Sequence, residues 1–384
     1  MLKEICEREL CTGCNICMNV CKTQAISFET DNIGHIYPKI NTDKCVGCNL
    51  CYKNCPSKKI TIENEITDKE VFVCWNKDSD FRNKSTSGGA ISTIAKSVFE
   101  MNGVVYSSKF NDDLLLELTR FANMASFEES RGTKYVKSSF GFQYNNILND
   151  LKKELQVLVV GTPCQIAALK MFLKIDYPNL LTVDFICHGV PSNELMISEV
   201  IHDVKKTKGN IVQFRDNNKY IWRILNLDNR VIFEKNRKKV PYCRGFDYSF
   251  TLRESCYNCK YINKNFSDFT VGDYWLAEKI FNFNIPSNGV SCLIANDKKH
   301  LDLLKDNKDL FMYSSSFDDV KKGQFHLNQS AKKPKLRKVY VFFSRLNMYY
   351  SMSIFTLIYH FYLNIYKTLA KSKVLRYIKR GGNI

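Results

Sequence analysis

The chain has 384 residues and sixteen cysteines, a length that predicts two or three folded units. Its formal net charge of +17 would suit a nucleic-acid-binding protein, but residues 332–384 hold twelve Lys and Arg and no Asp or Glu. The rest of the chain therefore carries only about +5, which argues against nucleic acid as a partner. Residues 1–10 are charged and lack the apolar core of a signal peptide, so we expect a cytoplasmic protein with reduced cysteines.

Two copies of one cysteine spacing fill residues 11–55. Each copy reads C-x2-C-x2-C-x3-C, and the second copy repeats the glycine and asparagine of the first. This spacing is typical of bacterial two-cluster ferredoxins, in which the last cysteine of each run ligates the other cluster. Zinc sites and disulfides are the alternatives, but zinc sites are usually built from two separate C-x2-C pairs. The sequence therefore predicts two [4Fe–4S] clusters, one held by Cys11, Cys14, Cys17 and Cys55, the other by Cys45, Cys48, Cys51 and Cys21.

We expect residues 1–65 to form a ferredoxin-type α+β domain whose sheet is completed by residues 60–62, with a linker at 64–69. Beyond it, Ser87, Gly88 and Gly89 end a Ser/Gly loop directly before a periodic apolar run at 90–99. Such a loop presents free N–H groups at the positive end of a helix dipole, which favours phosphate. An ordinary helix cap is the alternative interpretation.

Residues 104–107 and 114–118 predict a hairpin or a pair of sheet strands, and 145–155 an amphipathic helix. Between them, Arg131 and Lys134 lie in a basic loop that suits an anionic ligand, unless it is an ordinary solvated turn.

Two largely apolar strands, at 157–160 and 180–186, each end in a turn that contains a cysteine. The first turn carries Gly161, Thr162 and Cys164, and the second carries Cys187. Apolar strands that alternate with helices predict a parallel sheet covered on both faces, and ligands collect at the carboxyl ends of such strands. We therefore expect the two cysteines to lie close together at a functional edge, although a lone buried cysteine is usually just a small apolar side chain.

A further C-x2-C pair, Cys256 and Cys259, follows three predicted strands at 211–215, 222–226 and 231–234. Alone it could be half a zinc site or a redox dithiol. With Cys164 and Cys187 it supplies four thiolates, enough for a third [4Fe–4S] cluster. We interpret the four remaining cysteines as structural: Cys6, Cys74, Cys243 and Cys292.

The carboxy-terminal segment has an uncharged stretch of 21 residues, 346–366, between basic flanks. Its length would span a bilayer, but its Asn, His, Ser, Thr and five Tyr residues make it a poor spanning helix. Basic flanks and aromatic residues favour a helix on an anionic membrane surface or on a partner protein. A helical cap on the protein's own core is the alternative.

Taken together, these motifs resemble the β subunit of coenzyme F420-reducing hydrogenase and its relatives, among them the F420H2 dehydrogenase input subunit and the plant 7-hydroxymethyl chlorophyll a reductase. The resemblance runs from about Cys11 to about Trp275 and includes Gly272-Asp273-Tyr274-Trp275. It implies a dicluster domain at 1–65, an α/β flavin and iron–sulfur domain at 70–330 and a basic amphipathic tail at 331–384. It also implies that Cys164, Cys187, Cys256 and Cys259 ligate a third cluster. Flavin or substrate contacts would come from Ser87, Gly88, Gly89, Arg131, Lys134, Gly161, Thr162 and Asp273.

The function implied is that of an FAD-containing iron–sulfur oxidoreductase. Electrons would pass between a ferredoxin-like donor, three [4Fe–4S] clusters, a flavin and an unidentified small-molecule acceptor. A non-catalytic electron-transfer subunit is the alternative, and a tail that anchors a polysaccharide-assembly complex is a third interpretation. Relatives encoded in surface-polysaccharide gene clusters extend the expectation to that biosynthesis, at the inner face of the membrane.

Overall fold

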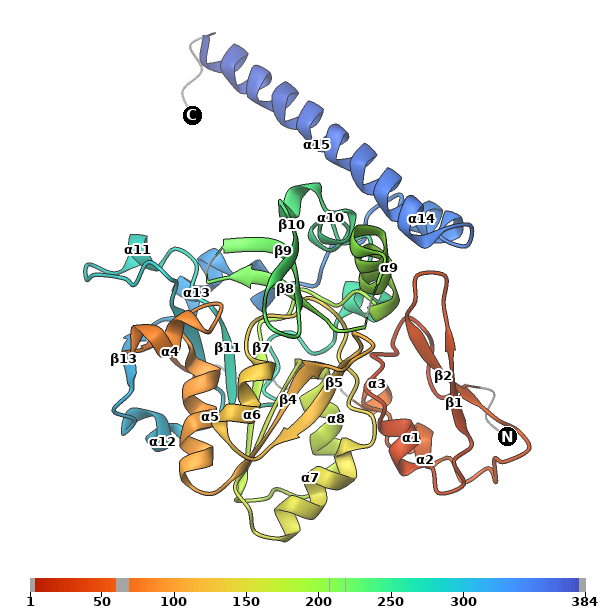
Figure 1. Cartoon of the computed structure of the whole chain (residues 1–384), viewed down its shortest axis with the longest axis vertical. Helices are drawn as coiled ribbons and strands as arrows, with labels where there is room; N and C mark the ends of the chain where they lie inside the picture. The colour runs from red at the N-terminus through yellow and green to blue at the C-terminus, as the bar shows by residue number, and fades with distance from the viewer. Residues whose placement is uncertain (1–3, 60–68, 207, 218, 380–384) are drawn as a thin grey trace.

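The computed structural model describes residues 4–59, 69–206, 208–217 and 219–379. Its amino-terminal module is a two-stranded antiparallel sheet with three short helices, at the right of Figure 1. These elements are α1 (Ile16–Val20), β1 (Ile26–Thr30), β2 (Ile36–Ile40), α2 (Leu50–Lys53) and α3 (Pro56–Lys59). The strand expected at 60–62 and most of the expected linker lie outside the described residues.

An eight-stranded mixed sheet forms the body, in the order β13-β3-β12-β11-β7-β6-β4-β5. The strands β4, β6, β7 and β11 run parallel, as the apolar strand patterns predict. β4 and β5 pair as the predicted hairpin, although β5 begins two residues later than expected, because Leu114 has a positive φ of 60° in the turn. The eight strands are β3 (Glu70–Asn76), β4 (Val104–Phe110), β5 (Leu116–Phe121), β6 (Val157–Gly161), β7 (Leu180–Phe185), β11 (Phe269–Asp273), β12 (Ser291–Ala295) and β13 (Leu310–Ser315).

Helices cover both faces of this sheet, so alternate strand residues enter different cores. Leu158 and Val160 pack with α5, α6 and α12, whereas Val157 and Val159 pack with α7 and α8. The module rests on the second face, where α1 lies against α7 and α8 (Figure 1). The covering helices are α5 (Ala90–Glu100), α6 (Met124–Phe127), α7 (Gln143–Lys152), α8 (Pro163–Leu173) and α12 (Leu301–Lys305). Shorter helices at the sheet's ends are α4 (Ser79–Asn83), η1 (Glu128–Ser130), α11 (Ala277–Ile280), α13 (Phe317–Gly323) and η4 (Phe325–Leu327).

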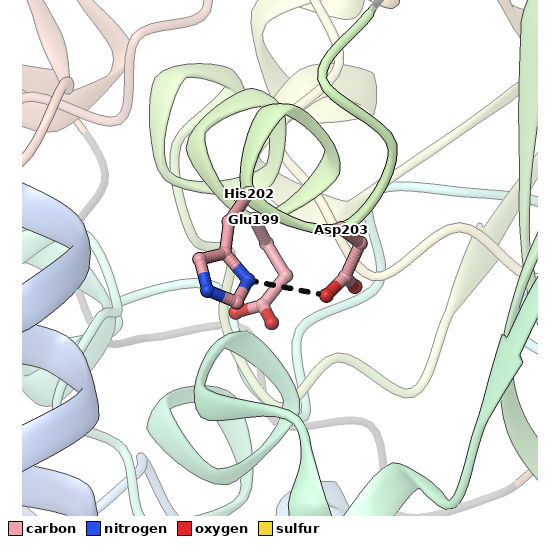
Figure 2. Close-up of side chains that lie close together, drawn as sticks. All are labelled: Glu199, His202 and Asp203. Atoms are coloured by element: carbon pink, nitrogen blue, oxygen red, sulfur yellow. Dashed lines mark hydrogen bonds and ion pairs between the residues drawn. The ribbon is translucent and has the colours of Figure 1, made fainter.

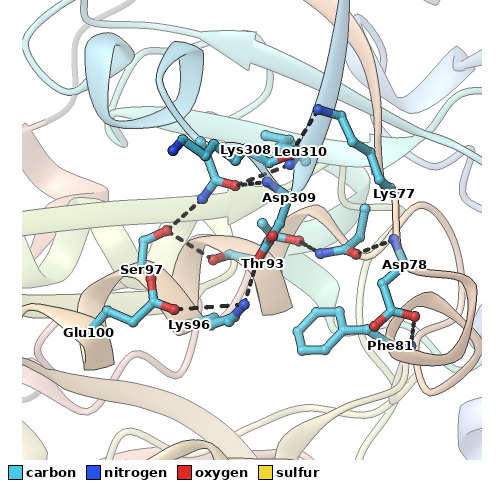
Figure 3. Close-up of polar contacts among 12 residues, drawn as sticks. Lys77, Asp78, Phe81, Thr93, Lys96, Ser97, Glu100, Lys308, Asp309 and Leu310 are labelled. Atoms are coloured by element: carbon cyan, nitrogen blue, oxygen red, sulfur yellow. Dashed lines mark hydrogen bonds and ion pairs between the residues drawn. The ribbon is translucent and has the colours of Figure 1, made fainter.

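Polar contacts tie α5 to β3 and to the segment directly before the edge strand β13 (Figure 3). Lys96 pairs with Asp309, and the Ser97 hydroxyl accepts a hydrogen bond of 2.7 Å from Asn307. Asn76, the last residue of β3, donates to the Thr93 hydroxyl at 2.8 Å. These contacts fix the start of α5, and hence the Ser/Gly loop before it, at the carboxyl end of β3.

A second core surrounds a small antiparallel sheet and α9. The sheet contains β8 (Asn210–Asp216), β9 (Lys219–Asn226) and β10 (Val231–Lys235), at the strand positions that the sequence predicts. It packs with α9 (Asn193–Val204), η2 (Arg237–Lys239) and α10 (Pro241–Asp247).

Glu199, His202 and Asp203 lie together on α9 (Figure 2). Asp203 accepts a hydrogen bond from the Trp222 indole at 2.9 Å, and Glu199 accepts one from the Tyr242 amide at 3.0 Å. This cluster therefore joins α9 to β9 and α10.

The carboxy-terminal segment forms α14 (Arg337–Phe343) and α15 (Met348–Lys379), and α15 projects from the body (Figure 1). Met352 and Thr356 are fully buried where α15 crosses α10. Phe355 and Tyr359 also pack against the core, whereas Phe361, Tyr362, Ile365 and Tyr366 are exposed, so the core-cap alternative describes α15 only up to about Tyr359. Within the described residues, no helix has the length and apolar character needed to cross a membrane.

Candidate iron–sulfur and flavin sites

The two cysteine runs of the module share one backbone conformation. Gly13 and Asn15 have φ angles of 65° and 67°, and their counterparts Gly47 and Asn49 have angles of 70° and 60°. Gly and Asn tolerate this left-handed conformation better than other residues do. The glycines and asparagines repeated in the sequence therefore mark identical turns that wind each run around its cysteines.

The first quartet consists of Cys11, Cys14, Cys17 and Cys55, and it is buried. Each of the four side chains is at most 8% exposed. Burial, followed by the neighbouring sulfurs of Cys14, Cys11 and Cys55, raises the pKa of Cys17 well above its ordinary value. The structure thus brings Cys55, the last cysteine of the second run, beside cysteines of the first run; that these four ligate one cluster stays a prediction.

Cys6 lies beside this quartet, although its spacing gave no sign of it. Hydrogen bonds from Cys6 lower the pKa of Cys11 to about 5 and that of Cys55 to about 7. It is therefore a neighbour of the first quartet.

The second quartet consists of Cys21, Cys45, Cys48 and Cys51, and all four line one pocket with Ile26 and Ile40. Cys48 is exposed and the other three are partly exposed. The Ala25 amide donates to the Cys21 sulfur at 3.3 Å. Two chemically equivalent quartets thus occupy different surroundings.

The third quartet consists of Cys164, Cys187, Cys256 and Cys259, and all four line one pocket of the body. Cys164 lies in the first turn of α8, directly after β6, and Cys187 follows β7. Cys256 lies in η3 (Glu254–Asn258), with Cys259 directly after it. Burial raises the pKa of Cys256 to about 11 and that of Cys259 to about 12. Thiolates that are costly to bury at Cys187, Cys256 and Cys259 fit a metal cluster that would neutralise them, with Cys164 as the fourth ligand.

The predicted flavin-contact residues of the Ser/Gly and basic loops lie side by side. The Arg131 guanidinium stacks on Phe81 at 4.4 Å and donates to the Ser85 hydroxyl at 3.0 Å. Lys134 donates to three carbonyls of its own loop, at 2.7 to 3.1 Å. Burial lowers the pKa of Lys134 to about 7. Both basic side chains thus stabilise the loops that carry them.

The remaining predicted contacts have structural partners too. The Ser87 hydroxyl donates to the Val290 carbonyl at 2.8 Å, and a Cβ at Gly88 would lie 2.4 Å from the Cys74 carbonyl oxygen. Gly89 precedes α5 with a φ of 79°. Gly161 ends β6, and Thr162 forms the capping box of α8.

Asp273, at the end of β11, contacts a group of side chains here called the arginine–aromatic cluster: Tyr135, Arg215, Tyr220, Arg237 and Trp275. The sequence singled out Asp273 and Trp275 but neither arginine. Asp273 accepts a hydrogen bond of 2.6 Å from Arg215. The Arg215 and Arg237 guanidinium carbons each lie 4.8 Å from the Tyr220 ring centroid. The Tyr220 and Trp275 rings stack at 6.3 Å. Arg215 and Arg237 come from segments without a recognisable spacing, so only the folded chain brings them together.

Two histidines connect this cluster to the third quartet. His188 stacks on His326 at 4.1 Å and lies 4.7 Å from Phe246, whose ring is 5.0 Å from Tyr135. Both histidines line the pocket of the third quartet. Burial, then His326, lowers the pKa of His188 to about 3, so its imidazole is neutral.

Comparison with known proteins agrees with the motifs. Residues 155–313 match the family that represents the C terminus of the coenzyme F420 hydrogenase/dehydrogenase beta subunit, and residues 10–59 match the 4Fe-4S dicluster domain. The chain thus joins a 4Fe-4S dicluster domain to an F420 hydrogenase/dehydrogenase β-subunit region. The predicted family is confirmed. The dicluster match contains the first two quartets, and the β-subunit match contains the third.

Among solved structures, the chain is similar to one in the F420-reducing [NiFe] hydrogenase complex from Methanosarcina barkeri, studied by xenon derivatization. The sequence identity is 15% and the TM-score is 0.46, and the match covers 74% of this chain and 90% of that chain. No curated protein matches the chain.

Proposed function

We propose that this protein is an iron–sulfur flavoprotein oxidoreductase with three [4Fe–4S] clusters. The observation that carries the proposal is the pocket at the carboxyl edge of the sheet, which gathers the third quartet from segments up to 95 residues apart in sequence. When bound, such clusters would carry single electrons and a flavin would combine two of them for an acceptor.

The arginine–aromatic cluster supports a site for the flavin or for its acceptor. Tyr220 and Trp275 are 42% and 37% exposed, so they offer aromatic surface for a planar ring. Beneath them, Arg215 Nε and Arg237 Nη1 are buried without a hydrogen-bond partner in the described part of the chain. Unsatisfied cationic donors under an open aromatic surface fit an anionic, planar ligand.

One observation favours the alternative of a non-catalytic electron-transfer subunit. Arg131 and Lys134, which the resemblance assigns to flavin or substrate, are engaged within their own loops. If no other residues held a flavin, the chain would pass single electrons between partner proteins.

Cofactor content of the anaerobically purified full chain separates these functions. The proposal expects flavin absorbance and about twelve irons per chain. Replacement of Cys256 by Ala should remove about four irons, while Cys243→Ala, at a buried cysteine outside the quartets, should remove none. About eight irons without flavin would leave only the electron-transfer subunit. The acceptor itself, including a substrate from surface-polysaccharide synthesis, stays a prediction.

We also propose that α15 attaches the protein to an anionic membrane surface. Several of its exposed apolar side chains lie three or four positions apart, and the helix projects from the body (Figure 1). The exposed apolar side chains are Tyr350, Ile354, Leu357, Ile358, Phe361, Tyr362, Ile365 and Tyr366, each 45–62% exposed. Twelve basic residues and no acidic residue accompany these side chains in 332–384, so the charge of the segment complements anionic lipid.

Co-sedimentation with vesicles tests this attachment. The full chain should bind vesicles that contain phosphatidylserine and should not bind vesicles of phosphatidylcholine alone. The double variant Phe361→Ser/Ile365→Ser should lose binding, while Leu227→Ser, at an apolar residue 69% exposed elsewhere, should retain it. Unchanged vesicle binding by the double variant would refute attachment through α15. Formation of a dimer through the same side chains would also refute it, because they would then be covered by a second copy of the chain.

A further inference from the structure

Arg253 connects the first quartet to the segment that carries the third. Its Nε donates to the Cys11 carbonyl at 2.6 Å, and its Nη2 lies 3.3 Å from the Cys11 sulfur and 2.9 Å from the Ile36 carbonyl. Its own carbonyl accepts a hydrogen bond from the Cys256 amide at 2.9 Å. The side chain also lines the pocket of the third quartet.

The Arg253 guanidinium is a buried cation without a carboxylate partner among the described residues. The residue is 1% exposed, and its Nη1 has no hydrogen-bond partner there. Tyr37 covers one face at 4.2 Å, and a Cβ placed on Gly13 would lie 3.0 Å from the guanidinium carbon. A buried unpaired cation is costly unless negative charge lies beside it, and here the sulfurs are the available source.

Burial alone would raise the free energy of adding negative charge at the first quartet. A thiolate-bound [4Fe–4S] cluster gains one negative charge when it is reduced, and low-dielectric surroundings disfavour that charge. A neighbouring cation and a hydrogen bond to a ligand sulfur act in the opposite direction. The second quartet is exposed to water, and among the described residues no arginine contact to its sulfurs is observed.

We propose that Arg253 is the counter-ion of the cluster held by the first quartet and raises its reduction potential. This inference rests on the proposed function, because it requires that the first quartet binds a cluster. Arg253 acts through the Cys11 ligand, so it is a tuning and positioning residue. Since Arg253 belongs to the body and Cys11 to the module, the potential of the first cluster also depends on correct docking of the module.

Redox titration with dithionite, monitored by electron paramagnetic resonance, tests the proposal in the full chain. Arg253→Met should lower the potential of the first cluster and leave the second unchanged. Arg253→Lys, which retains charge but loses the fork of donors, should give a smaller decrease. Cys48→Ala, which removes a ligand of the second quartet, identifies the signal of each cluster. An unchanged first potential in a variant with full iron content would overturn the proposal.

A second measurement uses the unmodified protein, so its result does not depend on whether the Arg253 variants fold. In protein labelled with nitrogen-15 arginine, pulsed electron paramagnetic resonance should detect an arginine nitrogen coupled to the reduced first cluster and none coupled to the second. Absence of that coupling on an intact first cluster would overturn the proposal. Absence of the first cluster itself, seen as missing iron in the unmodified protein, would instead contradict the proposed function.

Discussion

The first and second quartets share one spacing and one pair of left-handed turns, yet their surroundings differ. The first quartet is buried between the module and the body, where Tyr144 donates to the Cys14 carbonyl at 2.7 Å and Arg253 contacts Cys11. The second quartet is more open to solvent, with Cys48 exposed and Cys21, Cys45 and Cys51 partly exposed. The sequence spacing therefore predicts the same ligand set twice, whereas the tertiary contacts give each predicted set its own electrostatic surroundings. The same substitution made at equivalent positions of both quartets should separate the effect of the shared spacing from the effect of the different surroundings.

The largest expected effect comes from removing one ligand of each quartet. Cys14→Ala and Cys48→Ala should each cost about four irons per chain. Only Cys14→Ala should also lower the melting temperature of the body, because Cys14 packs in the core that contains α7 and α8. Iron analysis and circular dichroism measure the two outcomes. Equal loss of thermal stability in both variants would show that docking of the module does not depend on the first quartet.

A change far from both quartets should alter stability without altering either cluster. Burial raises the pKa of Glu199 to about 7, above the ordinary value of about 4.3. The folded state then binds more protons between about pH 4 and pH 7, so stability is highest below this window and falls as the pH rises through it, by up to about 3 kcal/mol.

The variant Glu199→Gln should abolish that slope in denaturant unfolding, because Gln stays neutral. Both cluster signals in electron paramagnetic resonance should stay unmoved. A slope that persists in the variant would assign the pH dependence to another group.

A smaller effect is expected from alanine at the equivalent glycines of the two runs. Gly13→Ala and Gly47→Ala both place a Cβ on a left-handed backbone, at a cost of about 1–2 kcal/mol each. At Gly13 the Cβ also meets the Arg253 guanidinium, whereas nothing lies within 4 Å at Gly47. Denaturant unfolding under anaerobic conditions should therefore show Gly13→Ala to be less stable by about a further 1 kcal/mol. Equal losses would mean that the guanidinium moves aside freely.

The sequence predicted those parts of the fold that depend on residues close together in the chain. It did not predict most contacts between residues far apart in the chain. Apolar strands that alternate with helices predicted the parallel strands and their shared carboxyl edge. A strand buried on both faces needs continuous apolar residues, and this local pattern is visible in the sequence. The repeated Gly and Asn of the two cysteine runs have left-handed backbone angles at equivalent positions, which is again a local effect. The Cys11–Arg253 contact joins residues 242 positions apart, and no period or spacing encodes it. Likewise, a basic loop suggests an anion site, but the sequence does not show that Lys134 binds its own carbonyls.

The central claim is that the chain binds three clusters and that the first lies beside the third. Electron paramagnetic resonance of the fully reduced, anaerobically purified chain tests it most directly. Thr12, next to Cys11, and Arg253, which contacts the Cys11 sulfur, both line the pocket of the third quartet, so the first and third quartets are neighbours. We predict about three spins per chain, with magnetic coupling that broadens the signal of the first cluster. In Cys256→Ala, about two spins should remain and that broadening should disappear. About two spins in the unmodified chain, with a spectrum unchanged by Cys256→Ala, would contradict the account.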